Sequence, residues 1–168
     1  MTPFDASFDP IFTNVVVYRE LASESLEAAE AFFEATRRQK DDGSGGHILT
    51  RDPARQSLKH SFIAIAFAGM YIEAALWLYG SRKLGVEKYT PIDLWKLETR
   101  LRPLGLEDND LEAKLKEYRE TRKEMVHEKA VPFSQDRTPT RYAQREARKA
   151  VEVMLQIQRI LLDRGLLV

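Results

Sequence analysis

The spacing of apolar and polar residues along the chain follows the period of an α-helix over most of its length. From Asn14 to Lys40 apolar residues recur at steps of three and four, and Asn14 has a side chain suited to capping the first helical turn. Residues 1–13 precede this pattern, contain two prolines, and are expected to form an extended arm. The expected buried face of the first helix consists of Val15, Tyr18, Ala22, Leu26, Ala29 and Phe33.

A glycine-rich stretch at residues 41–52, expected to be a flexible loop, leads to a far more apolar segment. Asp52 and Pro53 predict a helix start, because a carboxylate suits the N-cap and proline suits the first helical position. This helix is expected to run to about Lys83, and its middle, SFIAIAFAGMYIEAALWLY, is long enough to cross a bilayer. Glu73 near its centre, together with the amphipathic character of the other helices, favours a buried central helix over a membrane span.

Three further helical segments complete the pattern. Thr90 and Pro91 predict the start of a short helix that stops before Pro103. Residues 111–129 and 140–163 predict two longer amphipathic helices. No segment has a convincing strand pattern, so we predict one all-α domain, an up-and-down bundle of four main helices plus one short helix. The expected buried face of the last helix consists of Val151, Met154, Leu155, Ile157 and Leu161.

Composition narrows the classes of function. The 26 basic and 26 acidic residues give a formal net charge of zero, so nucleic-acid binding by bulk charge is excluded and a local basic patch would be needed. The absence of cysteine excludes disulfides and thiolate zinc sites. No histidine and carboxylate cluster has ligand spacing, so we expect neither a metal nor a cofactor. The acidic start of the sequence is unlike a secretory signal, and we expect a cytoplasmic protein.

Within the segment 111–129, one position departs from a plain amphipathic helix. Arg122 lies four residues after Tyr118 and three before Met125, inside the apolar stripe. An unpaired buried charge costs several kcal/mol, so Arg122 must be paired or must face a water-filled groove. Glu73 of the central helix is the obvious candidate partner.

His127 follows Arg122 by five residues and carries the side chain best suited to move protons near neutral pH. On an ideal helix the two side chains point about 140° apart, so one regular helix does not bring them together. A joint site therefore needs a loosened helix end, or a second copy of the chain that supplies the other half of the groove. The second possibility predicts a homodimer.

The motif Arg122-Lys-Glu-Met-Val-His127, following the apolar helix that contains GMYIEAALWLY, resembles the HEPN (higher eukaryotes and prokaryotes nucleotide-binding) domain family. That family is recognised by an arginine and a histidine separated by a short spacer, on a late helix of a small α-helical bundle. The resemblance covers roughly residues 54 to 164. It implies an HEPN-like fold and a metal-independent endoribonuclease that acts as a dimer, a toxin or defence nuclease with an antitoxin protein as a further partner.

The resemblance also implies roles for individual residues. His127 would move protons at the nucleophile or the leaving oxygen, Arg122 would stabilise charge on the phosphoryl oxygens, and Glu73 would hold Arg122 in place. The candidate RNA-binding residues are Arg119 and Lys123 on the same helix, and Arg141, Arg145 and Arg148 on the last helix. The spacing of the last three aligns them on one side of their helix, which is also the pattern of an ordinary solvated face.

A second interpretation retains the predicted fold but assigns the protein no catalytic activity. The protein would then be a non-catalytic helical dimer that serves as a binding or regulatory module. Arg122 would pair with Glu73 for structure alone, and His127 would be a cation near the C-terminal end of the helix, where the helix dipole favours it.

Overall fold

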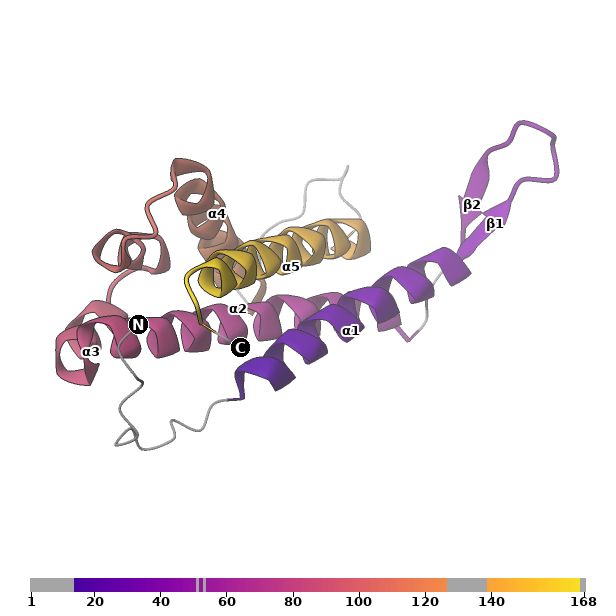
Figure 1. Ribbon diagram of the computed structural model, residues 1–168. Helices are drawn as coiled ribbons and strands as arrows, with labels where there is room; N and C mark the ends of the chain where they lie inside the picture. The colour runs from indigo at the N-terminus through magenta and orange to yellow at the C-terminus, as the bar shows by residue number, and fades with distance from the viewer. Residues whose placement is uncertain (1–13, 51, 53, 127–138, 167–168) are drawn as a thin grey trace.

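Helices dominate the structure, a computed structural model that describes residues 14–50, 52, 54–126 and 139–166 (Figure 1). The predicted all-α class is confirmed, apart from one small hairpin. The predicted arm at residues 1–13 lies outside the described residues. In chain order the elements are α1 (Val15–Ala35), β1 (Arg37–Gln39), β2 (His47–Leu49), α2 (Gln56–Leu84), α3 (Val86–Asp93), the 3-10 helices η1 (Leu97–Arg100) and η2 (Arg102–Leu104), α4 (Asn109–Val126) and α5 (Pro139–Asp163).

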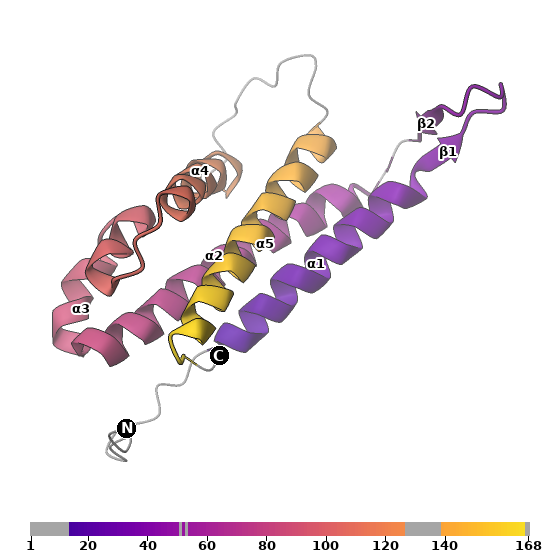
Figure 2. The ribbon, with the colours of Figure 1, turned by 45° about the horizontal axis from the view of Figure 1, so that its top comes forward.

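The four long helices alternate in direction, with α1 and α4 running one way and α2 and α5 the other (Figure 2). The most extensive contacts are those of α2 with α1 and with α5. The shorter elements α3, η1 and η2 carry the chain from the end of α2 to the start of α4. Helix α4 packs against η1, α5 and α2, so its side chains meet three different elements.

Helix α2 provides the centre of the core. Small residues on its buried side let neighbouring helices approach closely, and Ala64, Ala68 and Ala75 are all fully buried. Among the described residues it is the one helix long and apolar enough to cross a membrane, yet 56% of its most apolar stretch is buried inside the protein. The observed burial agrees with the predicted central core helix.

The end of the first helix differs from the prediction. Helix α1 stops at Ala35 instead of Lys40, and Arg37–Gln39 pairs antiparallel with His47–Leu49. Thr36 ends the helix, with its hydroxyl donating a hydrogen bond to the Phe33 carbonyl at 2.6 Å. Both strands have three residues, and β1 is fully exposed, so no alternation of buried and exposed positions marked them in the sequence. The predicted flexible loop at 41–52 thus contains one strand of a hairpin.

Two predicted helix starts are also shifted. Helix α2 begins at Gln56, and Asp52 still serves its start by accepting a hydrogen bond from the Ser57 backbone N–H at 3.2 Å. Helix α3 begins at Val86, directly after Gly85, instead of at Thr90. Gly85 has a positive φ of 87°, a conformation that ends α2 and redirects the chain, and the Thr90 hydroxyl bonds back to the Val86 carbonyl at 2.8 Å instead of capping a helix.

The last helix runs from Pro139 to Asp163, close to the predicted range. Four of the five residues predicted for its buried face are buried. Leu155 is the exception, with 42% of its surface exposed. Consecutive residues on a helix point about 100° apart, so Leu155 is turned away from the face on which the neighbouring Met154 is fully buried.

Candidate functional site

The predicted pairing of Arg122 with Glu73 is confirmed. Arg122 Nη1 on α4 donates a hydrogen bond to Glu73 Oε1 on α2 at 2.6 Å. The two side chains are 32% and 42% exposed, so the ion pair lies at the margin of the core and remains accessible to water. Desolvation alone would lower the pKa of Arg122, but the hydrogen bond to Glu73 and the electrostatic effects of Tyr118 and Glu73 together outweigh it, and the pKa is raised. Arg122 therefore carries a fixed positive charge at the protein surface.

A close contact between α2 and α4 sets the position of Arg122. The Tyr118 hydroxyl, one helical turn before Arg122, donates a hydrogen bond to the Ile65 carbonyl at 2.9 Å. Gly69 makes this approach possible, because a Cβ atom there would lie 2.1 Å from Tyr118 Oη and 3.4 Å from Arg122 Nη1. Burial raises the pKa of Tyr118 well above its usual value, so the hydroxyl keeps the proton that it donates. Ile65, Gly69 and Glu73 are four residues apart and form one contact face for α4.

An exposed apolar surface borders this ion pair. Phe62, Ile63 and Met70 of α2 are 39%, 37% and 36% exposed. Together with Ala66 they form what we call the outer stripe, because their spacing places them on the side of α2 opposite its fully buried residues. Glu73 follows Met70 by three residues and therefore lies at the end of the outer stripe.

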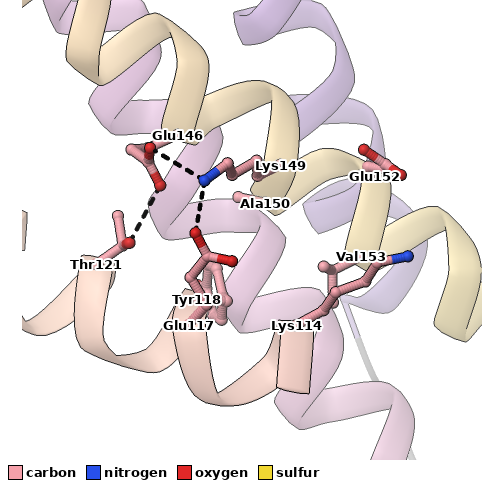
Figure 3. A pocket seen from close by; sticks show the side chains of 9 residues that line it. All are labelled: Lys114, Glu117, Tyr118, Thr121, Glu146, Lys149, Ala150, Glu152 and Val153. Carbon is pink, nitrogen blue, oxygen red and sulfur yellow. Dashed lines mark hydrogen bonds and ion pairs between the residues drawn. The ribbon is translucent and has the colours of Figure 1, made fainter. Parts of the chain in front are cut away.

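A second polar site lies between α4 and α5 and was not predicted. Glu146 is only 4% exposed, although it is ionisable. Thr121 donates a hydrogen bond to it at 3.2 Å, and Lys149 approaches it at 3.5 Å (Figure 3). Arg145 also approaches it, at 2.8 Å. Lys149 also reaches Glu117 of α4 at 2.5 Å, beside a cavity of about 210 Å³. These contacts satisfy the buried carboxylate and tie α5 to α4.

The spacing of buried residues on α5 indicates the position of Glu146 on that helix. Glu146 lies three residues after Ala143 and four before Ala150, both of which are buried. It therefore occupies the apolar face of α5 in the same way that Arg122 occupies the apolar stripe of α4.

The other residues predicted on α4 have different surroundings. Arg119 donates two hydrogen bonds, from Nε and Nη2, to the carboxylate of Glu98 in η1, each at 3.1 Å. Arg119 also pairs with Glu120 at 2.9 Å, so it is already engaged within the protein. Lys123 is exposed, with no ion pair to any described residue. The role of both residues in RNA binding stays a prediction.

The three arginines predicted on α5 are all exposed, and they lie beside the hairpin. Arg141, Arg145 and Arg148 line a cavity of about 420 Å³ together with Arg37 and His47 of the hairpin. The structure thus brings these three residues together with two that sequence spacing could not connect to them. The predicted catalytic residue His127 lies outside the described residues, and its position relative to Arg122 stays a prediction.

Comparison of the chain with known protein families, curated proteins and solved structures finds no match.

Proposed function

We propose that this protein is a metal-independent endoribonuclease of the HEPN type that acts as a homodimer. In this proposal Arg122 and His127 are the catalytic residues and Glu73 is a positioning residue. The observation that carries the proposal is the state of Arg122, which is charged, oriented by a 2.6 Å hydrogen bond and still one-third exposed at the edge of an apolar surface. A purely structural arginine in an apolar seam would not need this accessibility.

The chemistry follows from the properties of these side chains. The 2′-hydroxyl of a ribose attacks the adjacent phosphorus, forming a 2′,3′-cyclic phosphate, and the bond to the 5′-oxygen of the next nucleotide breaks. His127 as a neutral imidazole accepts the 2′-hydroxyl proton and then delivers it to the leaving 5′-oxygen. Arg122 stabilises the charge that grows on the phosphoryl oxygens. Because Glu73 occupies Nη1 of Arg122, the remaining N–H groups are those that would contact the phosphate.

The outer stripe supports the dimer. Contiguous exposed apolar residues are typical of surfaces that another protein covers, and a two-fold contact brings the same patch of both chains together. Glu73 lies at the end of this stripe and holds Arg122, so a two-fold contact centred on that end of the outer stripe would bring the two ion pairs toward one shared groove. The wider expectation of a cytoplasmic toxin or defence nuclease with an antitoxin partner rests on the family resemblance.

The test is a cleavage assay on single-stranded RNA in excess EDTA, with the purified wild-type chain and its Arg122→Ala and His127→Ala variants. The proposal predicts fragments that end in 2′,3′-cyclic phosphate and that disappear with either substitution. Arg38→Ala is a matched control, because Arg38 is an exposed hairpin residue outside the proposed site. Intact RNA at high protein concentration, or cleavage that survives both substitutions, would contradict the proposal.

A second candidate is a non-catalytic helical dimer that serves as a binding or regulatory module. The close approach at Gly69 favours it, because Tyr118 and Arg122 both take part in holding α4 against α2. In that case the ion pair with Glu73 is one more structural contact. The same assay separates the two candidates, because the second predicts that a folded dimer leaves RNA intact.

A further inference from the structure

A basic cavity lies between the β-hairpin and the first turns of α5, away from the Arg122–Glu73 pair. We call it the basic pocket; its volume is about 420 Å³. Arg37 and His47 come from the two strands, and Phe33 comes from the last turn of α1. Arg141, Arg145 and Arg148 come from α5. Four arginines from segments about a hundred residues apart in the chain thus converge on one cavity.

The charges in the basic pocket are only loosely compensated. Among the described residues Glu34 is the one carboxylate in the lining, and it pairs with Arg37 at 2.9 Å while its side chain is 59% exposed. Arg148 pairs with Glu30 at 2.5 Å, again with both side chains well exposed. Arg141 has no ion pair with any described residue. Exposed ion pairs contribute little to stability, so an incoming phosphate can replace these carboxylates at little cost.

Arg145 is held in position in the basic pocket by a buried carboxylate. Its guanidinium reaches the buried carboxylate of Glu146 at 2.8 Å, and Glu146 in turn accepts the hydrogen bond of Thr121 on α4. Thr121 directly precedes Arg122. A continuous set of polar contacts therefore connects the basic pocket with the turn of α4 that carries Arg122.

The size and lining of the pocket indicate the class of ligand. A volume of about 420 Å³ lies in the range of small-molecule pockets and exceeds what one inorganic phosphate fills. Arginine side chains match the geometry of phosphate oxygens, and the half-buried ring of Phe33 offers an apolar surface on which a base can stack. We infer that the basic pocket binds the phosphodiester backbone of single-stranded RNA. This inference deepens the proposed function and rests on it, because it assigns a substrate-binding surface to the proposed nuclease.

Binding is measured by fluorescence anisotropy with a labelled 2′-O-methyl oligouridylate, which cannot be cleaved because its 2′-oxygen is blocked. The Arg37→Gln, Arg141→Gln double variant is compared with wild type over a range of KCl concentrations. We expect the dissociation constant to rise about tenfold for each lost guanidinium. We also expect the slope of log affinity against log salt to decrease by about 0.7 per lost phosphate contact.

Two control substitutions each remove one positive charge, and together they match the two charges lost in the double variant. Arg38→Gln alters the same hairpin outside the pocket, and Arg159→Gln alters α5 about 27 Å further along the helix. Both are expected to bind like wild type, and circular dichroism melts confirm that every variant is folded. Wild-type affinity and salt slope in the double variant, or an equal loss in the controls, would overturn the inference. Competition by inorganic phosphate at constant ionic strength that matches competition by unlabelled oligonucleotide would instead identify a free-phosphate site and would also overturn it.

The outcome is separable from that of the proposed function. If RNA is not cleaved but the double variant alone loses affinity, RNA binding by the basic pocket is supported and the nuclease proposal is contradicted. If RNA cleavage depends on Arg122 and the double variant binds RNA like wild type, RNA binding by the basic pocket is contradicted and the nuclease proposal is supported.

Discussion

Arg122 and Glu146 are each a charged residue inside an apolar helical face, and the two differ in how far the sequence predicted them. Arg122 is alone in its stripe, and the cost of an unpaired charge led directly to Glu73, which the structure shows at 2.6 Å. Glu146 is flanked by Arg145 and Lys149, so its local sequence looks like an ordinary charged surface. The hydrogen bond that its carboxylate accepts comes from Thr121 of α4, a contact that spacing along one helix does not reveal.

At the residue scale, Gly69→Ala tests the contact that positions Arg122. Alanine ordinarily stabilises a helix interior relative to glycine by about 0.5–1 kcal/mol. Here the new Cβ would lie 2.1 Å from Tyr118 Oη, and relieving such an overlap typically costs about 1–3 kcal/mol. We therefore expect a net decrease in the free energy of unfolding of about 1 kcal/mol or more, measured by urea denaturation.

The same substitution in a Tyr118→Phe background is the control for this prediction. Removing the hydroxyl leaves the ring carbon Cζ, at 3.2 Å, as the nearest atom to the new Cβ. Most of the overlap then disappears, so in this background Gly69→Ala should lower the free energy of unfolding much less, or should even raise it. An equal loss of stability in both backgrounds would show that the Tyr118 hydroxyl is not what the glycine accommodates.

At the scale of elements, the long helices could be predicted and the hairpin and short helices could not. The ranges of α1, α2, α4 and α5 follow from apolar periodicity and capping residues sustained over many turns. The strands β1 and β2 are three residues each and lack such a period, and α3 begins at a turn set by Gly85. The basic pocket was missed for this reason, because two of its residues lie in the hairpin.

The ion pair of Arg119 with Glu98 attaches η1 to α4 and gives a pH-dependent prediction. Burial alone would raise the pKa of Glu98. The hydrogen bonds from Arg119, a backbone hydrogen bond and the positive charges of Arg119 and Lys96 together outweigh it, and the pKa is lowered from its usual 4.5. A carboxylate with a lowered pKa in the folded state contributes stability above about pH 4.5, and this contribution is lost as the pH falls through the folded-state value. We expect Glu98→Gln to lower the free energy of unfolding by about 1 kcal/mol at pH 7.

The difference between wild type and Glu98→Gln should shrink toward zero as the pH is lowered below 4.5, measured by urea denaturation at a series of pH values. Glu107→Gln is the matched control, because Glu107 pairs with Arg102 at 3.3 Å while both side chains are largely exposed, and little change is expected. A difference that persists undiminished at acid pH would show that Glu98 contributes through packing and not through its charge.

At the scale of the whole molecule, the sequence predicted a helical bundle around α2, and the structure adds where that bundle is left uncovered. The prediction was possible because α2 is apolar on nearly every side while its neighbours are amphipathic. Which side of α2 stays exposed depends on where α1, α4 and α5 settle, and this is a property of the assembled fold. The outer stripe is therefore a result of the structure alone.

Met70→Glu tests the proposed dimer. A carboxylate at this position of the outer stripe, next to Glu73, would be buried without a partner in a two-fold contact, which costs several kcal/mol. We expect wild type to sediment at twice the chain mass of 19.4 kDa and the variant to sediment as a monomer. Leu162→Glu, at an equally exposed apolar position on α5, should remain dimeric. A monomeric wild type, or a dimer that persists in Met70→Glu, would contradict the proposed groove shared by two chains.

The central claim is that Arg122 acts on RNA, and the most direct measurement is the single-turnover rate of RNA cleavage by Arg122→Ala compared with wild type in EDTA. We predict a decrease of at least about a hundredfold, the usual effect of removing one group that stabilises transition-state charge. Because the ion pair with Glu73 is partly exposed, the free energy of unfolding should change by no more than about 1 kcal/mol. An unchanged cleavage rate in the folded variant, or no cleavage by the wild-type protein, would contradict the claim.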